Sequence, residues 1–162
     1  MAVLLMATTV FAQKPNFAGK WTRDAEKTAA ANPAMAAGGG GGGGGRGPGG
    51  GGGGGGDMTI TQDATSFTIE RAGQGGATTK TTYKFDGEGK NMGGRDGTTE
   101  IPYKAKSTGA TVSVEVTQQG QNGPTVTTTV YSTEGEWLVT AATRPGRDGA
   151  PQTTKTYYKK AS

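Results

Sequence analysis

Between residues 57 and 162 the chain is a series of short segments in which apolar and polar residues alternate, separated by turns of only a few residues. In Thr111-Val112-Ser113-Val114-Glu115-Val116-Thr117 the valines share one face and the polar residues the other, which is the period of a half-buried β-strand. Turns as short as Glu134-Gly135 force neighbouring strands to pair antiparallel. No gap accommodates a crossover helix, so a parallel α/β fold is excluded.

The same pattern predicts nine strands, each rich in Thr, Val, Tyr and Phe and bounded by Gly, Asp or Asn. One lies around Trp21, and the others span 58–62, 66–71, 78–86, 98–107, 111–118, 125–132, 136–143 and 153–160. An antiparallel meander with one apolar face must fold over as a sandwich or close as a barrel. Serial hairpins favour closure, which removes exposed edges. We therefore predict an all-β, antiparallel up-and-down barrel of eight or nine strands.

A glycine-rich tract at 38–56 interrupts this pattern and contains 17 of the chain's 32 glycines. It has few side chains to bury and loses much backbone entropy on ordering, so we expect a disordered loop. The preceding segment, 13–37, holds the first strand and a polar, alanine-rich connection. Within its 29–37 part the alanines allow about one helical turn before Pro33 and the glycines end it. Residues 57–162 form the meander that completes one barrel with the strand near Trp21.

The first twelve residues have the pattern of a secretory signal peptide. They are uncharged and mostly apolar, with Val10 and Ala12 at the minus-three and minus-one positions of a cleavage site before Gln13. The basic n-region is missing, which indicates an upstream start or a trimmed chain; a buried N-terminal strand is the alternative. No run reaches the roughly 18 apolar residues of a transmembrane helix. We expect an exported protein of the periplasm or the cell exterior.

The chain contains no Cys and no His. This excludes disulfides, thiolate or imidazole metal sites and a Ser-His-Asp triad. Carboxylates at Glu100, Glu115 and Glu136 fall on outward phases, and the spacing within 86–91 misses that of a calcium loop. We therefore expect no catalytic residue, no metal site and no cofactor; an enzyme would require Asp, Glu or Tyr side chains that converge inside the barrel.

The net charge of +4 comes from 17 basic and 13 acidic residues spread over positions that alternation places outside. That value is ordinary for a small domain. The glycine-rich tract holds one arginine, Arg46, whereas binding of single-stranded nucleic acid requires many basic and aromatic residues. We expect a monomer with no nucleic-acid partner.

The segment Phe17-Ala18-Gly19-Lys20-Trp21-Thr22, followed by Asp24 and Lys27, resembles the opening F-x-G-x-W of the lipocalin and fatty-acid-binding (calycin) superfamily. It is similar in particular to small exported lipocalin-like proteins of bacteria. Further elements carry the resemblance, which covers about 17–28 and 57–160: the 58–62 strand, a hairpin ending in Ile69-Glu70-Arg71, Tyr83-Lys84-Phe85-Asp86-Gly87, and the closing Lys155-Thr156-Tyr157-Tyr158-Lys159-Lys160.

This resemblance implies an eight- to ten-strand barrel whose apolar interior holds a small ligand. It implies that Trp21 plugs the closed end and that Gly19 lets the first strand bend there. A basic side chain of the last strand would pack over the tryptophan, with Lys155 and Lys159 as candidates. Fatty-acid-binding proteins carry a carboxylate-binding Arg-x-Tyr where this chain has Lys155-Thr156-Tyr157. The glycine-rich tract would lie in a loop at the open mouth, as a lid or a tolerated insertion.

We accordingly predict a binder or carrier of a small apolar or amphipathic ligand. The candidate lining residues are those of the apolar phase: Trp21, Phe67, Ile69, Tyr83, Phe85, Ile101, Tyr103, Val112, Val114, Val130, Trp137 and Val139. The alternative is a ligand-free structural or interaction module of the cell envelope, in which the same side chains fill the barrel, since eight strands enclose little more than side-chain volume.

Overall fold

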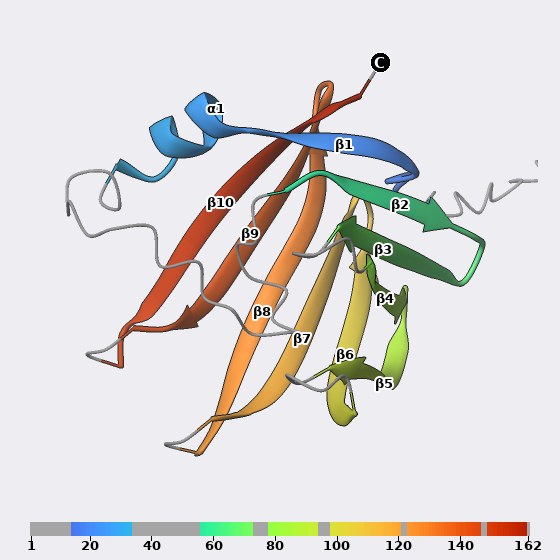
Figure 1. Ribbon diagram of the computed structural model, residues 1–162, viewed down its shortest axis with the longest axis vertical. Helices are drawn as coiled ribbons and strands as arrows, with labels where there is room; N and C mark the ends of the chain where they lie inside the picture. Colours follow the sequence, from blue (N-terminus) through green and yellow to red (C-terminus); the bar gives the residue numbers. More distant parts are fainter. Residues whose placement is uncertain are drawn as a thin grey trace, which may run out of the picture.

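The structure, a computed structural model, describes residues 14–33, 56–72, 78–93, 98–120, 123–146 and 149–161. Within these ranges the chain forms ten strands and a short helix α1 (Ala25–Ala30) (Figure 1). The strands are β1 (Gly19–Asp24), β2 (Met58–Gln62), β3 (Ser66–Ala72), β4 (Thr78–Lys84), β5 (Gly87–Gly93), β6 (Thr99–Thr108), β7 (Thr111–Gly120), β8 (Gly123–Glu134), β9 (Trp137–Pro145) and β10 (Pro151–Lys160).

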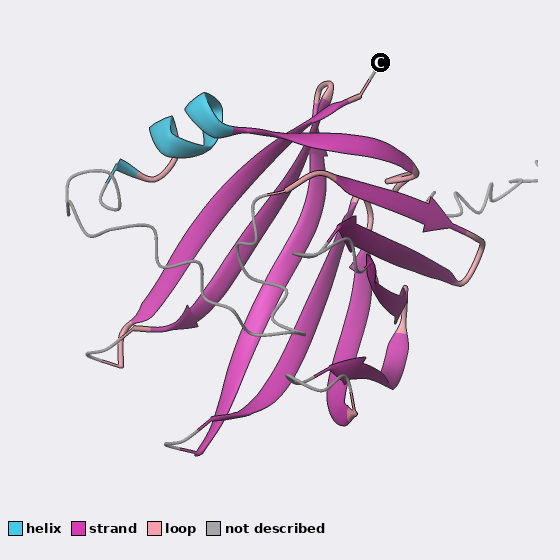
Figure 2. Ribbon diagram, viewed as in Figure 1, coloured by secondary structure: helices cyan, strands magenta, loops and turns pink. Residues whose placement is uncertain are grey.

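All ten strands belong to one antiparallel sheet, in the order β4-β3-β2-β1-β10-β9-β8-β7-β6-β5. Strands that follow one another in sequence pair with each other, except β4 and β5. In addition, the first strand, β1, pairs with the last, β10. The sheet curls into a nearly closed up-and-down barrel, and α1 lies at one end of it beside β10 (Figures 1 and 2). The predicted fold class is confirmed, with one strand more than expected.

The additional strand is β5, in a segment that the sequence pattern assigned to a turn. Its inward positions are Gly87, Gly89, Asn91 and Gly93, so it lacks the apolar alternation of its neighbours. The Tyr103 ring lies against this glycine face, and a Cβ on Gly89 would be only 2.6 Å from the Tyr103 hydroxyl oxygen. Glycine in this strand therefore provides the space for an aromatic ring of the next strand.

Aromatic rings fill the end of the barrel at which the β2–β3 and β4–β5 turns lie. Phe67 is central: its ring centroid lies 5.3–5.9 Å from those of Phe17, Tyr83, Phe85 and Tyr131. All five side chains are buried. Edge-to-face and tilted ring pairs of this kind stabilise a core beyond the area that they bury, so this end is closed by packing.

Trp21 joins this core, and the structure corrects which lysine covers it. The indole N–H donates to the Phe17 carbonyl over 2.8 Å, and the ammonium of Lys160 lies 5.8 Å from the ring centroid. Lys160 is the register partner of Trp21, so the two share a face, whereas Lys155 and Lys159 face outward. Gly19 has φ +142°, and a Cβ there would be 2.9 Å from the Lys160 side chain.

Helix α1 protects the edge of β10 where β1 leaves it. The helix starts earlier than the predicted turn, because the Asp24 side chain caps it by accepting from Lys27 N at 2.7 Å. Thr28 Oγ1 accepts the N–H of Tyr157 over 3.0 Å. The Asn32 amide accepts from Lys155 N at 2.9 Å and donates to Lys155 O at 2.7 Å. Side chains thus supply the backbone partners that a strand would otherwise provide.

The seam between β4 and β5 is closed in the same way. The Asn91 side chain accepts from Thr82 N at 3.1 Å and donates to Thr82 O at 3.0 Å. Further along, the Tyr103 hydroxyl accepts the N–H of Lys84 over 3.3 Å. Two inward-facing side chains therefore span a gap that no backbone ladder crosses.

Two predicted segments lie outside the described residues: the signal peptide at 1–12 and the glycine-rich loop at 38–56, apart from exposed Gly56. The export and loop assignments stay predictions. Across the described ranges, no helix combines the length and apolar character needed to cross a membrane.

Replacing Asn91 by Ala is expected to open the seam, because it removes both hydrogen bonds to Thr82. Each neutral hydrogen bond contributes on the order of 1 kcal/mol, so we expect a loss of about 1–2 kcal/mol in the free energy of unfolding. Hydrogen exchange followed by NMR should show faster exchange of the Thr82 amide, with unchanged amides in the β7–β8 ladder. Met92→Ala, at an exposed neighbouring position, is the control; equal exchange at Thr82 in both variants would contradict this account of the seam.

Candidate functional site in the barrel interior

Nine of the twelve predicted lining residues lie together in the buried core of the barrel. Each has less than a tenth of its surface exposed, and all belong to one continuous apolar cluster. They are Trp21, Phe67, Ile69, Tyr83, Phe85, Ile101, Tyr103, Val112 and Val114. Their burial is compatible with a ligand-binding barrel and with a packed, ligand-free barrel, because the side chains face inward in both cases.

The other three predicted lining residues face outward and not into the barrel, which corrects the prediction: Val130, Trp137 and Val139. The register pairs Val139 with Tyr157 and Val130 with Ser113, both on the outer face. Trp137 packs edge-on against the Tyr157 ring at 6.5 Å. The Lys27 ammonium of α1 lies 4.8 Å from the Trp137 ring centroid, so α1 covers part of this outer surface. The apolar phase therefore does not mark the interior on β9.

The inward residues of β8, β9 and β10 change in size along the strands. Tyr131, Leu138 and Tyr158 face inward towards the aromatic core, and Arg144 and Gln152 face inward at the opposite end. Between them lie the smaller side chains that we call the threonine wall: Thr127, Thr129, Thr140, Ala142, Thr154 and Thr156. Thr129, Thr140 and Thr156 are buried, whereas Thr127, Ala142 and Thr154 are half-buried. Solvent therefore reaches part of the inner surface. The sequence pattern does not indicate this wall, since threonine in an alternating strand predicts an outward position.

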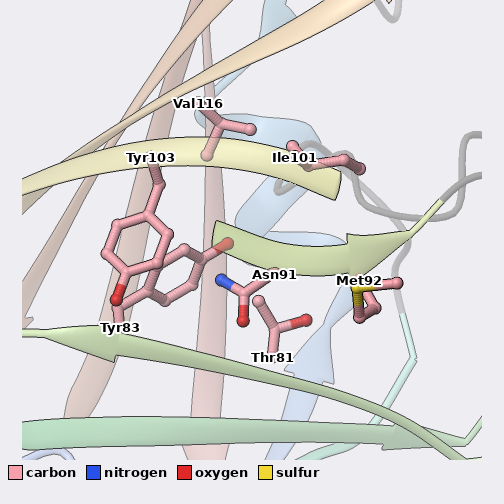
Figure 3. A pocket seen from close by; sticks show the side chains of 7 residues that line it. All are labelled: Thr81, Tyr83, Asn91, Met92, Ile101, Tyr103 and Val116. Atoms are coloured by element: carbon pink, nitrogen blue, oxygen red, sulfur yellow. The ribbon is translucent and has the colours of Figure 1, made fainter. Parts of the chain in front are cut away.

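A small pocket lies at the seam, on the inner side of the Asn91 bridge (Figure 3). Its lining combines three predicted residues with four others: Tyr83, Ile101 and Tyr103, and Thr81, Asn91, Met92 and Val116. The volume open to the centre of a water-sized sphere is about 10 Å³, which is room for about one water molecule. A lipid-sized ligand needs far more space, so this pocket is a feature of the seam and not the ligand chamber.

Two of the rings around Phe67, Tyr83 and Tyr131, carry buried phenol groups. Burial raises the pKa of the Tyr83 phenol to about 12 and shifts the pKa of Tyr131 upward as well. The positive charge of Arg71 opposes both shifts. No buried side-chain nitrogen or oxygen of the described residues lacks a hydrogen-bond partner.

Arg71 is a second inward residue that the lining prediction omitted. It follows Phe67 and Ile69 at two-residue spacing on β3, so it shares their inner face. Its Nη2 lies 3.6 Å from the sulfur of Met58, its register partner, which is 2% exposed. Its two-residue spacing from Ile69 is the sequence signal for an inward position, whereas its charge predicts an outward one.

Three solved structures share this architecture. The zebrafish ileal bile acid-binding protein complexed with cholic acid superposes with a TM-score of 0.56 at 14% identity, over 90% of this chain and 98% of that one. Secretory abundant heat soluble protein 4 from Ramazzottius varieornatus gives 0.55 at 20% identity, over 95% and 100%. A REP1-NXSQ fatty acid transporter gives 0.54 at 14%, over 90% and 96%.

At these identities the likeness establishes the fold alone, an up-and-down antiparallel β-barrel with ten strands in the described residues. No protein-family model matches the chain, and no curated protein matches it.

The buried phenols predict a specific alkaline response. Because the folded-state pKa of Tyr83 lies above the unfolded value of 10.0, its contribution to stability is complete below pH 10 and is lost as the pH rises through about 12. In an ultraviolet titration of the folded protein, we expect part of the phenol absorbance change to appear near pH 12, where Tyr83 titrates. Tyr83→Phe should remove that part. Ionisation of all five phenols together near pH 10, with the fold intact, would contradict this prediction.

Proposed function

We propose that the protein is a non-catalytic binder or carrier of a small amphipathic molecule, which it encloses beside the threonine wall. The observation that carries the proposal is the difference between the two halves of the interior. One end is filled by five aromatic rings, whereas the threonine wall further along β8–β10 presents small side chains, some of them half-buried. The aromatic end provides a floor for a ligand, and the small residues leave it space.

The fold and the comparisons support this proposal. A ten-stranded barrel is wider than an eight-stranded one, whose interior side chains alone nearly fill. Two of the structural neighbours are described as a fatty acid transporter and as a bile acid-binding protein complexed with cholic acid. Threonine hydroxyls beside apolar rings suit a ligand that has both polar and apolar parts.

Export is the second part of the proposal and rests on the first twelve residues. With its Val10 and Ala12 cleavage pattern the segment favours a mature protein that begins at Gln13 and acts in the periplasm or outside the cell. The measurement is the N-terminal mass of the protein recovered from a periplasmic or culture fraction. Recovery of the uncleaved chain in the cytosol would contradict this part alone.

The binding proposal is tested with protein purified from Gln13 onward without delipidation. Native mass spectrometry should detect a co-purifying small molecule, and its extraction should lower the melting temperature, because a ligand of the native state stabilises by mass action. Fluorescence titration with 11-(dansylamino)undecanoic acid and with its methyl ester provides a defined second probe. A clean apo mass together with no binding of either probe would favour the alternative, a ligand-free module with a packed barrel.

A matched pair of variants locates the site. Ala142→Phe places a ring on the threonine wall and is expected to weaken binding of both probes about tenfold or more, because it fills the space that the ligand uses. Ala141→Phe adds the same ring one residue away on the outer face and should leave both affinities unchanged. Equal affinities in the two variants would show that the ligand does not lie along this wall.

A further inference from the structure

A second aromatic cluster lies on the outer wall of the barrel, next to α1. Trp137 of β9 and Tyr157 of β10 both face outward, although the family resemblance implied an interior role for the segment that contains Tyr157. Their rings meet edge-on, with centroids 6.5 Å apart and planes at 78°. Tyr157 is buried, whereas Trp137 is half-buried. The two ring surfaces are thus nearly perpendicular, and one of them is partly open to solvent.

An ammonium group lies between these rings. The Nζ of Lys27, on α1, is 4.8 Å from the centroid of Trp137 and 5.0 Å from that of Tyr157. Both distances fall within the range of a cation–π interaction, which extends to about 6 Å. The ammonium of Lys159 approaches the indole less closely, at 5.8 Å. The two rings therefore form two walls of a box for a cation, which we call the Trp137–Tyr157 box, and a lysine of the chain itself occupies it.

A carboxylate lies beside the Trp137–Tyr157 box. The Tyr157 hydroxyl donates to Glu134 Oε2 over 3.2 Å, and Glu134 is also the register partner of Trp137. This hydrogen bond holds the phenol ring in place, and the negative charge attracts a cation over a longer distance. Among the described residues, the Lys27 ammonium forms no salt bridge. Its attraction to the box thus comes mainly from the ring faces.

Such surroundings suit a quaternary ammonium better than a primary one. A lysine ammonium carries three N–H donors and is strongly hydrated, so contact with ring faces removes water that the rings do not replace. A trimethylammonium group has no N–H donor, and aromatic cages recognise it through its charge and its methyl groups. Lys27 is exposed, so its side chain can leave the box for water.

We propose that the Trp137–Tyr157 box binds a quaternary ammonium group of the choline type, which displaces the side chain of Lys27. Trp137 and Tyr157 supply the ring faces, and Glu134 supplies the negative charge. Because this site lies on the outer wall, it is separate from the interior ligand proposed above. The trimethylammonium group belongs both to free choline and to the head group of phosphatidylcholine.

The test is a titration with choline chloride, followed by the two indole N–H resonances of the protein in NMR spectra. The resonance of Trp137 should shift in a saturable manner, whereas that of the buried Trp21 should stay in place. Two analogues serve as controls: 3,3-dimethylbutan-1-ol, the uncharged carbon isostere of choline, and ethanolamine, its primary ammonium counterpart. At equal ionic strength, both should bind more weakly than choline.

Four variants test the roles of the residues, with affinities measured from the methyl resonance of choline. Lys27→Ala should raise the affinity about threefold or more, because it removes a tethered competitor while alanine preserves the helix. Trp137→Leu should lower it about tenfold or more, and Glu134→Gln about twofold or more. Lys106→Ala removes the same charge from the outer face of β6 and should leave it unchanged.

Sedimentation with phosphatidylcholine vesicles identifies the source of the group. Binding of the wild type but not of Trp137→Leu supports a lipid head group, and binding of free choline without binding of vesicles supports a soluble ligand.

Three results would overturn the proposal. The first is no shift of Trp137 with choline in both the wild type and Lys27→Ala. The second is an equal response to choline and to the uncharged alcohol, which indicates apolar contact alone. The third is a Lys27→Ala variant whose choline affinity does not exceed that of the wild type, which shows that the rings serve only to hold α1 through Lys27.

Discussion

Pairing of backbone groups at the places where strands separate is the constraint on which this barrel depends. A meander of ten strands leaves two edges, and unpaired edges in water invite aggregation or fraying. Here β1 separates from β10 at α1, and β4 never meets β5, yet an asparagine amide spans each gap: Asn32 to Lys155 and Asn91 to Thr82. Because an amide both donates and accepts, one side chain replaces one residue of a strand. Closure of the sheet in this way creates the inner surface that any ligand would meet.

The inner surface then divides by side-chain size. Rings around Phe67 occupy one end, and threonines and Ala142 line the other. Burying apolar ligand area contributes roughly 25 cal/mol per Å², so the small wall offers affinity only to a molecule that fills it.

The alternation of the sequence predicted nine of the strands and the core around Phe67, Tyr83 and Val112, because inward apolar residues set the period. The prediction from alternation was wrong where inward residues are not apolar or where apolar residues face outward. Glycines in β5 removed the apolar signal, since the Tyr103 ring supplies it from the next strand. Trp137 suggested the wrong phase because Lys27 of α1, distant in sequence, contributes to its cover, and Val139 lies on the same outer face. The asparagine bridges and the seam follow from tertiary closure, which no local pattern encodes.

Closure of the barrel also depends on the chemical stability of the two bridging asparagine side chains. Asparagine amides are among the thermolabile groups of proteins, and hydrolysis converts the amide nitrogen, a donor, into a carboxylate oxygen, an acceptor. At Asn91 the carbonyl of Thr82 would then face a negative oxygen instead of an N–H group, so attraction on one half of the bridge becomes repulsion. Hydrolysis of the Asn91 amide, a mass gain of about one dalton, would thus weaken the contact between β4 and β5. The stability of the barrel would then decrease as this chemical modification accumulates.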